Sequence, residues 1–167
     1  MGGIHSHREL DIYFQGMDHT DTKHVDSDRS LREFLAGMFG YAPPWLGFLY
    51  RVRWLLAVIL GLERHAGAGP APGLTPRELS FTPGERVSFF VVRAAREGVY
   101  WVAQAPRDRH LEAWVGVVAE PLDNGRSRFH VFTSVRYLRW TGPVYFTLIR
   151  PFHHLVVAAM MRAGAKG

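Results

Sequence analysis

The sequence predicts an α+β domain over residues 17–167, with an antiparallel sheet of about five strands, two N-terminal helices and a long C-terminal helix packed across the sheet. Three patterns predict this order. Apolar residues recur at helical spacing before residue 63, alternate with polar residues between 86 and 138, and return to helical spacing after 143. With 47% hydrophobic and 13% aromatic residues, the chain can fill one core.

Residues 1–16 are expected to lie outside this domain. The stretch from Ile12 to Gly16, placed before Met17, is typical of a protease-cleavage site left from an expression tag. His5 and His7 are similarly typical of a metal-affinity tag. We therefore assign residues 1–16 to a tag remnant and residues 17–167 to a single domain.

The first elements of the domain are a short strand and a short helix. A strand is expected around Lys23–Asp26. Ser30 and Glu33 then form a capping box, in which each residue satisfies a free amide of the other, and this box predicts the start of a helix. Gly40 is a suitable stop for that helix.

A second helix is expected from Pro43-Pro44 to about Leu60, because proline costs no hydrogen bond in a first helical turn. It is apolar on both sides, but Arg51 and Arg53 in its middle argue against a membrane span. A core helix covered on two sides is favoured, with an interfacial helix as the alternative. Residues 64–76, rich in Gly, Pro and Ala, then indicate a linker or a lid.

The second half of the chain predicts a meander followed by a helix. A helix is expected over Pro143–Arg162, and Pro151 should kink or split it. The turn dipeptides and alternating residues before it predict four strands, at Arg86–Ala94, Val99–Gln104, His110–Glu120 and Phe129–Leu138.

Composition excludes several classes of function. The chain has no cysteine, which removes disulfides, thiolate catalysis and cysteine metal sites and fits a reducing cytoplasm, the expected location. The net charge is +5, but the arginines are scattered and no recognition motif accompanies them, so no nucleic-acid partner is expected. His153 and His154 are adjacent on a helix and do not face one site, so no metal is expected.

Several short motifs follow one another in a recognisable order. They are Pro44-Trp45 with Arg53, Gly61-Leu62, Pro83-Gly84, Asp108-Arg109-His110-Leu111, Gly142-Pro143-Val144-Tyr145 and Pro151-Phe152-His153. In this order the chain resembles the bacterial domain of unknown function 2867 family (DUF2867). The resemblance implies a START-like, helix-grip fold, in which apolar ligands commonly lie between a curved sheet and the C-terminal helix. No G-x-G-x-x-G occurs, so no dinucleotide cofactor is expected.

The leading functional hypothesis is the binding of a small apolar or amphipathic molecule between the sheet and the C-terminal helix. It comes from the resemblance rather than from a recognisable site. In the alternative, the same residues close a solid core and the domain is a protein–protein interaction module. The expected sheet wall is Phe129, Val131, Val135 and Tyr137, and the expected helix wall is Tyr145, Ile149, Phe152 and Val156.

An enzyme of the cyclase or hydrolase kind is a second alternative. It would use Asp108, His110 and His153 at the pocket mouth, with His110 as a general acid or base oriented by Asp108. The competing interpretation is structural: Asp108 forms the turn and the histidines are satisfied locally. The latter is favoured, so catalysis is not the expected activity.

A homodimer is the remaining expectation. Trp114 and Phe132 lie on the strand faces opposite the core, and Tyr50, Trp54 and Val58 lie behind the main stripe of the second helix. A contiguous apolar surface usually marks an interface, and twofold dimers are the commonest assembly. The alternative is that another segment of the chain covers these residues.

Overall fold

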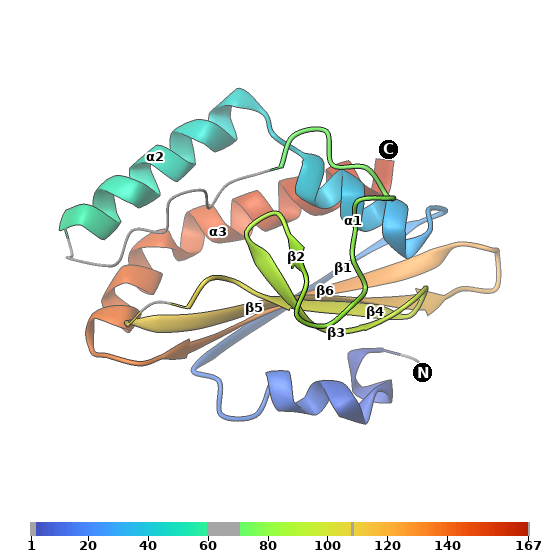
Figure 1. The fold of residues 1–167 in the computed structure, drawn as a ribbon, viewed down its shortest axis with the longest axis horizontal. Coiled ribbons are helices and arrows are strands. Elements are labelled where there is room, and N and C mark those ends of the chain that lie inside the picture. The colour runs from blue at the N-terminus through green and yellow to red at the C-terminus, as the bar shows by residue number, and fades with distance from the viewer. Residues whose placement is uncertain (1–2, 60–70, 108, 167) are drawn as a thin grey trace.

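One antiparallel sheet organises the molecule, with strand order β1-β6-β5-β4-β3-β2 (Figure 1). The structure is a computed structural model that describes residues 3–59, 71–107 and 109–166. The predicted α+β class with a helix-grip arrangement is confirmed, because three helices lie on one side of the sheet and the C-terminal helix is the longest. The strands are β1 (His19–Ser27), β2 (Arg86–Val87), β3 (Phe90–Arg96), β4 (Tyr100–Gln104), β5 (Leu111–Pro121) and β6 (Ser127–Tyr137).

The first and last strands are neighbours in this sheet. β1 pairs with β6 along its whole length, from His19 opposite Val135 to Ser27 opposite Ser127. β6 in turn pairs with β5, and this register places Val115 opposite Thr133. The predicted inward faces of these two strands therefore form one continuous surface.

The strand expected over Arg86–Ala94 is two strands joined by a tight turn. The turn falls at Ser88 and Phe89, and Ser88 has a φ of +56°, which is uncommon for a residue other than glycine. The turn contains no Gly, Pro or Asn, the residues from which turns were predicted, so the sequence did not indicate it. The split raises the number of strands, counted over the described residues, from about five to six.

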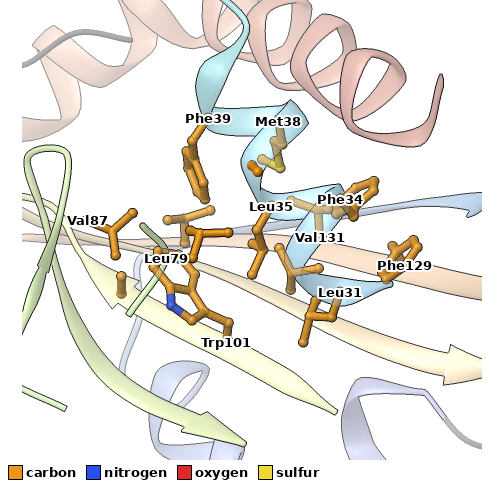
Figure 2. Close-up of a cluster of buried hydrophobic side chains, with 14 of the residues drawn as sticks. Leu31, Phe34, Leu35, Met38, Phe39, Leu79, Val87, Trp101, Phe129 and Val131 are labelled. Atoms are coloured by element: carbon orange, nitrogen blue, oxygen red, sulfur yellow. The ribbon is translucent and has the colours of Figure 1, made fainter. Parts of the chain in front are cut away.

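Helix α1 (Leu31–Gly40) covers one half of the sheet's inner face. Its capping box is formed as predicted: the Ser30 amide donates to Glu33 Oε2 at 2.8 Å, and the Glu33 amide donates to Ser30 Oγ at 3.3 Å. Phe34 stacks on Phe129 of β6 with 4.2 Å between ring centroids. Figure 2 shows this core, in which Trp101 lies beneath the helix among aliphatic side chains.

Helix α3 (Thr141–Lys166) crosses the same face and continues through Pro151, so the expected split does not occur. Its last turns pack closely against α1. A Cβ atom on Gly164 would lie 2.6 Å from the carbonyl oxygen of Phe34, so only glycine allows this approach. Ser27 Oγ also donates to the carbonyl of Ala165 at 2.8 Å, which joins α3 to β1.

Helix α2 (Pro44–Ile59) lies outside α3, farther from the sheet than α1 (Figure 1). It is not the doubly covered core helix that its composition favoured, because Phe48, Leu55 and Ile59 are exposed. Apolar residues on every side of a helix do not specify which of them will be covered. Leu60 and residues 64–70 of the expected linker lie outside the described residues.

Residues 3–16 pack against the outer face of the sheet, opposite the three helices (Figure 1). Two short 3-10 helices, Ile4–Ser6 and Arg8–Tyr13, place Leu10 and Tyr13 against Val118 and Phe132. Phe14 also lies 4.6 Å from Phe132, measured between ring centroids. This segment therefore covers part of the strand surface on which a homodimer was expected, and the dimer stays a prediction.

Candidate functional site

A cavity of about 300 Å³, partly open to solvent, lies between the sheet, α2 and α3. Most of its lining comes from three walls. The sheet contributes Ala113 and Val115 from β5 and Thr133 and Val135 from β6. The α3 wall comprises Tyr145, Phe146, Ile149, Phe152, His153, Val156, Val157 and Met160, and the α2 wall comprises Leu46, Leu49, Tyr50, Val52, Arg53, Trp54 and Leu56.

Five of the eight predicted ligand-binding residues line this cavity: Val135, Tyr145, Ile149, Phe152 and Val156. The other three are placed elsewhere. Phe129 and Val131 are buried in the core beneath α1, at the end of β6 that α1 covers. Tyr137 lies at the opposite end of β6, where its backbone amide donates to Asp18 Oδ2 at 2.7 Å.

The α2 wall was not anticipated as part of a site. Its pattern of apolar residues was recognised, but helical spacing alone does not show whether a helix packs on a solid core or over a void. Arg53 was the available signal. An arginine among apolar residues offers a charged donor to nearby polar groups, and here Arg53 Nε donates to Tyr145 Oη at 2.8 Å. This hydrogen bond connects α2 to α3 beside the cavity.

The cavity is apolar apart from a few groups, and none of its lining residues within 3–59, 71–107 and 109–166 is an aspartate or a glutamate. Arg53 supplies the positive charge, and Thr133, Ser88 and the tyrosines supply hydroxyl groups. An arginine in such a lining favours a ligand whose polar end is neutral or anionic and accepts hydrogen bonds.

His153 contributes an imidazole to the α3 wall of the cavity. Burial lowers its pKa from the ordinary value of 6.5 to about 4, and the neighbouring charges of His154 and Arg53 act in the same direction. Its Nε2 lies 3.4 Å from Thr133 Oγ1 on the sheet. The imidazole is therefore neutral at physiological pH and acts as a polar wall group.

His110 occupies a tight corner at the start of β5 and is buried. Its Nδ1 contacts Thr141 Oγ1, and its carbonyl oxygen accepts the Leu138 amide at 2.8 Å. A Cβ atom on Gly142 would lie 2.6 Å from this carbonyl, which shows how closely α3 begins against it. These contacts give His110 a structural role at the turn into α3.

The two histidine candidates do not lie in one site. His110 contacts Thr141 at the first turn of α3, whereas His153 lies about 18 Å farther along the helix at 1.5 Å per residue. That separation exceeds hydrogen-bond reach and the reach of one bridging water. Asp108 lies outside the described residues.

A second group of polar side chains joins β1 to α3 outside the cavity. Lys23 contacts Asp21, and its Nζ lies 3.1 Å from His154 Nδ1. Burial alone would raise the pKa of Asp21, but the hydrogen bond and charge of Lys23 outweigh it and hold that pKa below its usual range. Within residues 3–59, 71–107 and 109–166, no group of three or more His, Cys, Asp or Glu side chains is arranged to hold a metal ion.

Comparison with protein families gives a match that spans most of the chain. The family model described as Protein of unknown function (DUF2867) matches residues 13–160, and so begins before the expected boundary at residue 17. No curated protein matches the sequence.

Among solved structures, the hypothetical protein jhp0584 from Helicobacter pylori is 11% identical, with a TM-score of 0.48 over 99% of both chains. The Mll3558 protein from Rhizobium loti is 12% identical, with a TM-score of 0.46 over 88% of this chain and 94% of that chain. Norcoclaurine synthase from Thalictrum flavum is 14% identical, with a TM-score of 0.45 over 99% of this chain and 94% of that chain. None of these similarities transfers a ligand or an activity.

Proposed function

The chain belongs to the DUF2867 family of proteins of unknown function, and we propose that it binds one small amphipathic molecule in the cavity between the sheet, α2 and α3. The observation that carries the proposal is the cavity itself. Its volume of about 300 Å³ is at the lower end of the range for small-molecule pockets. A cavity of this size also argues against the alternative of an interaction module with a solid core.

The arrangement of the walls supports an amphipathic ligand with a definite orientation. Val135, Ile149 and Val156 offer an aliphatic surface for an apolar body. Arg53 and Tyr145 lie at the α2–α3 side, and they offer donors to a carbonyl, carboxylate or sulfonate group. A cationic head would meet Arg53, and none of the lining residues that the structure describes carries a carboxylate to compensate, so cationic ligands are disfavoured.

Acid–base catalysis is not part of the proposal. His110 is held at a turn by backbone and side-chain contacts, and His153 is neutral and lies along the apolar wall. A general acid and base must reach the same reacting atoms, and the positions of these two imidazoles do not allow it.

A matched pair of fluorescent probes tests the proposal. 8-Anilinonaphthalene-1-sulfonate carries an anionic head, and N-phenyl-1-naphthylamine has a similar aromatic body without charge. Both probes are expected to bind the purified protein. Ile149→Trp, which fills the cavity, should abolish binding of both, whereas Leu148→Trp on the exposed side of the same helix should not.

Arg53→Met tests the contribution of the probe's charged head group separately from that of its aromatic body. Loss of a charge-assisted hydrogen bond is expected to weaken binding of the anionic probe about tenfold or more, with little effect on the neutral probe. Unchanged binding of both probes in Ile149→Trp would show that they attach elsewhere and would overturn the proposal. If the probes bind as expected, native mass spectrometry of the protein purified from cells identifies the natural ligand by its mass.

A further inference from the structure

Helices α2 and α3 expose more apolar surface than a covered helix pair requires. On α2, Phe48 and Ile59 are 63% and 69% exposed, and with Arg51 and Leu55 they recur at intervals of three and four residues. That spacing places these four side chains on one exposed stripe of the helix. On α3, Val144, Leu148 and Leu155 form a comparable exposed stripe. Both helices lie on the same side of the sheet (Figure 1).

The ionic side chains of these two helices are of one sign. Neither α2 nor α3 contains an aspartate or a glutamate. The exposed charges are Arg51 and Arg53 on α2, and Arg150, Arg162 and Lys166 on α3. An exposed apolar stripe with only basic charges matches a partner that is apolar and anionic.

From this combination we propose that the α2–α3 face docks onto the surface of an anionic phospholipid bilayer. Aliphatic and aromatic side chains with basic neighbours are the composition of helices that lie in a membrane interface. Tryptophan favours the same depth, and Trp45 and Trp54 on α2 are exposed.

A second copy of the chain is a poorer partner for this face. A twofold interface brings the same patch of each subunit together, so arginines would face arginines. Neither helix has a carboxylate to pair with them. Burying these charges against each other is costly, whereas lipid phosphates neutralise them.

The face lies on a bilayer rather than crossing it. Within the described residues, α3 is long and apolar enough by length and composition to span a membrane, but its other side is built into the fold. Tyr145, Phe146, Val157 and Met161 are buried, and Gly164 is in close contact with α1. A spanning α3 would have to leave the sheet.

The cavity reaches the surface of the same two helices. Trp54 and Phe152 both line the cavity and are 55% and 45% exposed, so part of its lining is exposed on α2 and α3. When the face is docked, an amphipathic molecule could pass between the bilayer and the cavity without crossing water. Docking itself does not depend on ligand binding, so the two proposals can fail separately.

Flotation with lipid vesicles tests the docking. The protein should float with phosphatidylcholine vesicles that contain phosphatidylglycerol, and much less with pure phosphatidylcholine vesicles, and added salt should weaken binding. Arg51→Gln is expected to weaken binding about fivefold, which corresponds to the usual contribution of one basic residue near an anionic surface. The matched control is Arg96→Gln, which should leave binding unchanged. Arg96 is exposed and lies opposite Tyr100 in the β3–β4 register, on the outer-face side of the sheet.

Apolar contacts are tested in the same way. Phe48→Ser should weaken binding about tenfold, whereas Ile12→Ser in the segment on the opposite side of the sheet should have no effect. Equal binding to both kinds of vesicle, or equal effects of Arg51→Gln and Arg96→Gln, would overturn the proposal. So would a dimer in sedimentation that Phe48→Ser dissociates, if no vesicle binding is seen, because that result assigns the face to a second copy.

Discussion

Leu10 is the residue whose substitution best tests whether residues 3–16 contribute to the folded domain. Its side chain is 0% exposed and packs with Tyr13, Val118 and Phe132 on the outer face of the sheet. Ile12 lies two residues away in the same 3-10 helix and is 63% exposed. The two residues have equal side-chain volume and opposite environments, so Ile12 is a matched control.

The magnitude follows from the burial of Leu10. Leucine-to-alanine changes in a core cost about 2–5 kcal/mol, because apolar contact is lost and a cavity remains. Residues 3–16 are anchored on one side only, so the cost cannot exceed the free energy with which the whole segment docks. We therefore expect Leu10→Ala to lower the free energy of unfolding by about 2–3 kcal/mol, and Ile12→Ala to change it by less than about 0.5 kcal/mol.

Urea unfolding followed by tryptophan fluorescence measures both variants, because Trp101 is buried and its emission should change on unfolding. A variant that lacks residues 1–16 sets the upper limit of the effect. If Leu10→Ala and Ile12→Ala are equally stable, the packing of this segment makes no energetic contribution and the reasoning is refuted. The truncated variant would then be as stable as the full chain.

Two further predictions concern the interior. His153 has a pKa of about 4 in the fold and 6.5 when unfolded, so the unfolded chain binds the proton first as the pH falls. The free energy of unfolding should therefore fall as the pH drops from about 6.5 to about 4, by at most about 3 kcal/mol. His153→Gln should flatten this part of the pH–stability profile. A smaller slope should remain from His19, whose pKa is also lowered, chiefly by burial. An unchanged profile would show that His153 does not cause the loss of stability. Gly164→Ala should destabilise the protein by about 1–3 kcal/mol, since the new Cβ meets a backbone oxygen at 2.6 Å. Gly47 on α2 has open space around it, with nothing within 4 Å of a new Cβ, so Gly47→Ala should be neutral or stabilising by up to about 1 kcal/mol. Thermal unfolding measures both variants, and equal shifts of their unfolding temperatures would contradict the prediction.

Local rules were enough to predict most of the fold. The capping box of Ser30 and Glu33 depends only on residues three apart, and it is formed as expected. The inward faces of β5 and β6 follow from the alternation of side chains along a strand, and the pairing of Val115 with Thr133 confirms that parity. Features of this kind are determined by residues that lie close together in the sequence.

The features that were missed depend on contacts between distant segments. Parity places Phe129 and Val135 on the same face of β6, but it does not show that α1 covers the first and a cavity lies over the second. The exposure of α2 is a similar case, because its apolar residues surround the helix and tertiary packing alone selects the covered side. Asp108 and His110 were candidates because polar residues cluster in sequence, whereas His110 proved to hold a turn.

The pairing of β1 with β6 has a consequence for how the protein is made. Position 19 meets position 135, so the first strand emerges from the ribosome long before its partner exists. At ordinary rates of translation the interval is on the order of 10 s, and an unpaired strand edge is prone to wrong association during that time. Most residues of β1 are polar, including Asp21, Lys23 and Asp26, and they disfavour such association before β6 is made. Closure of the sheet is then the late, slow step of folding, because its longest loop closes only when the chain is almost complete.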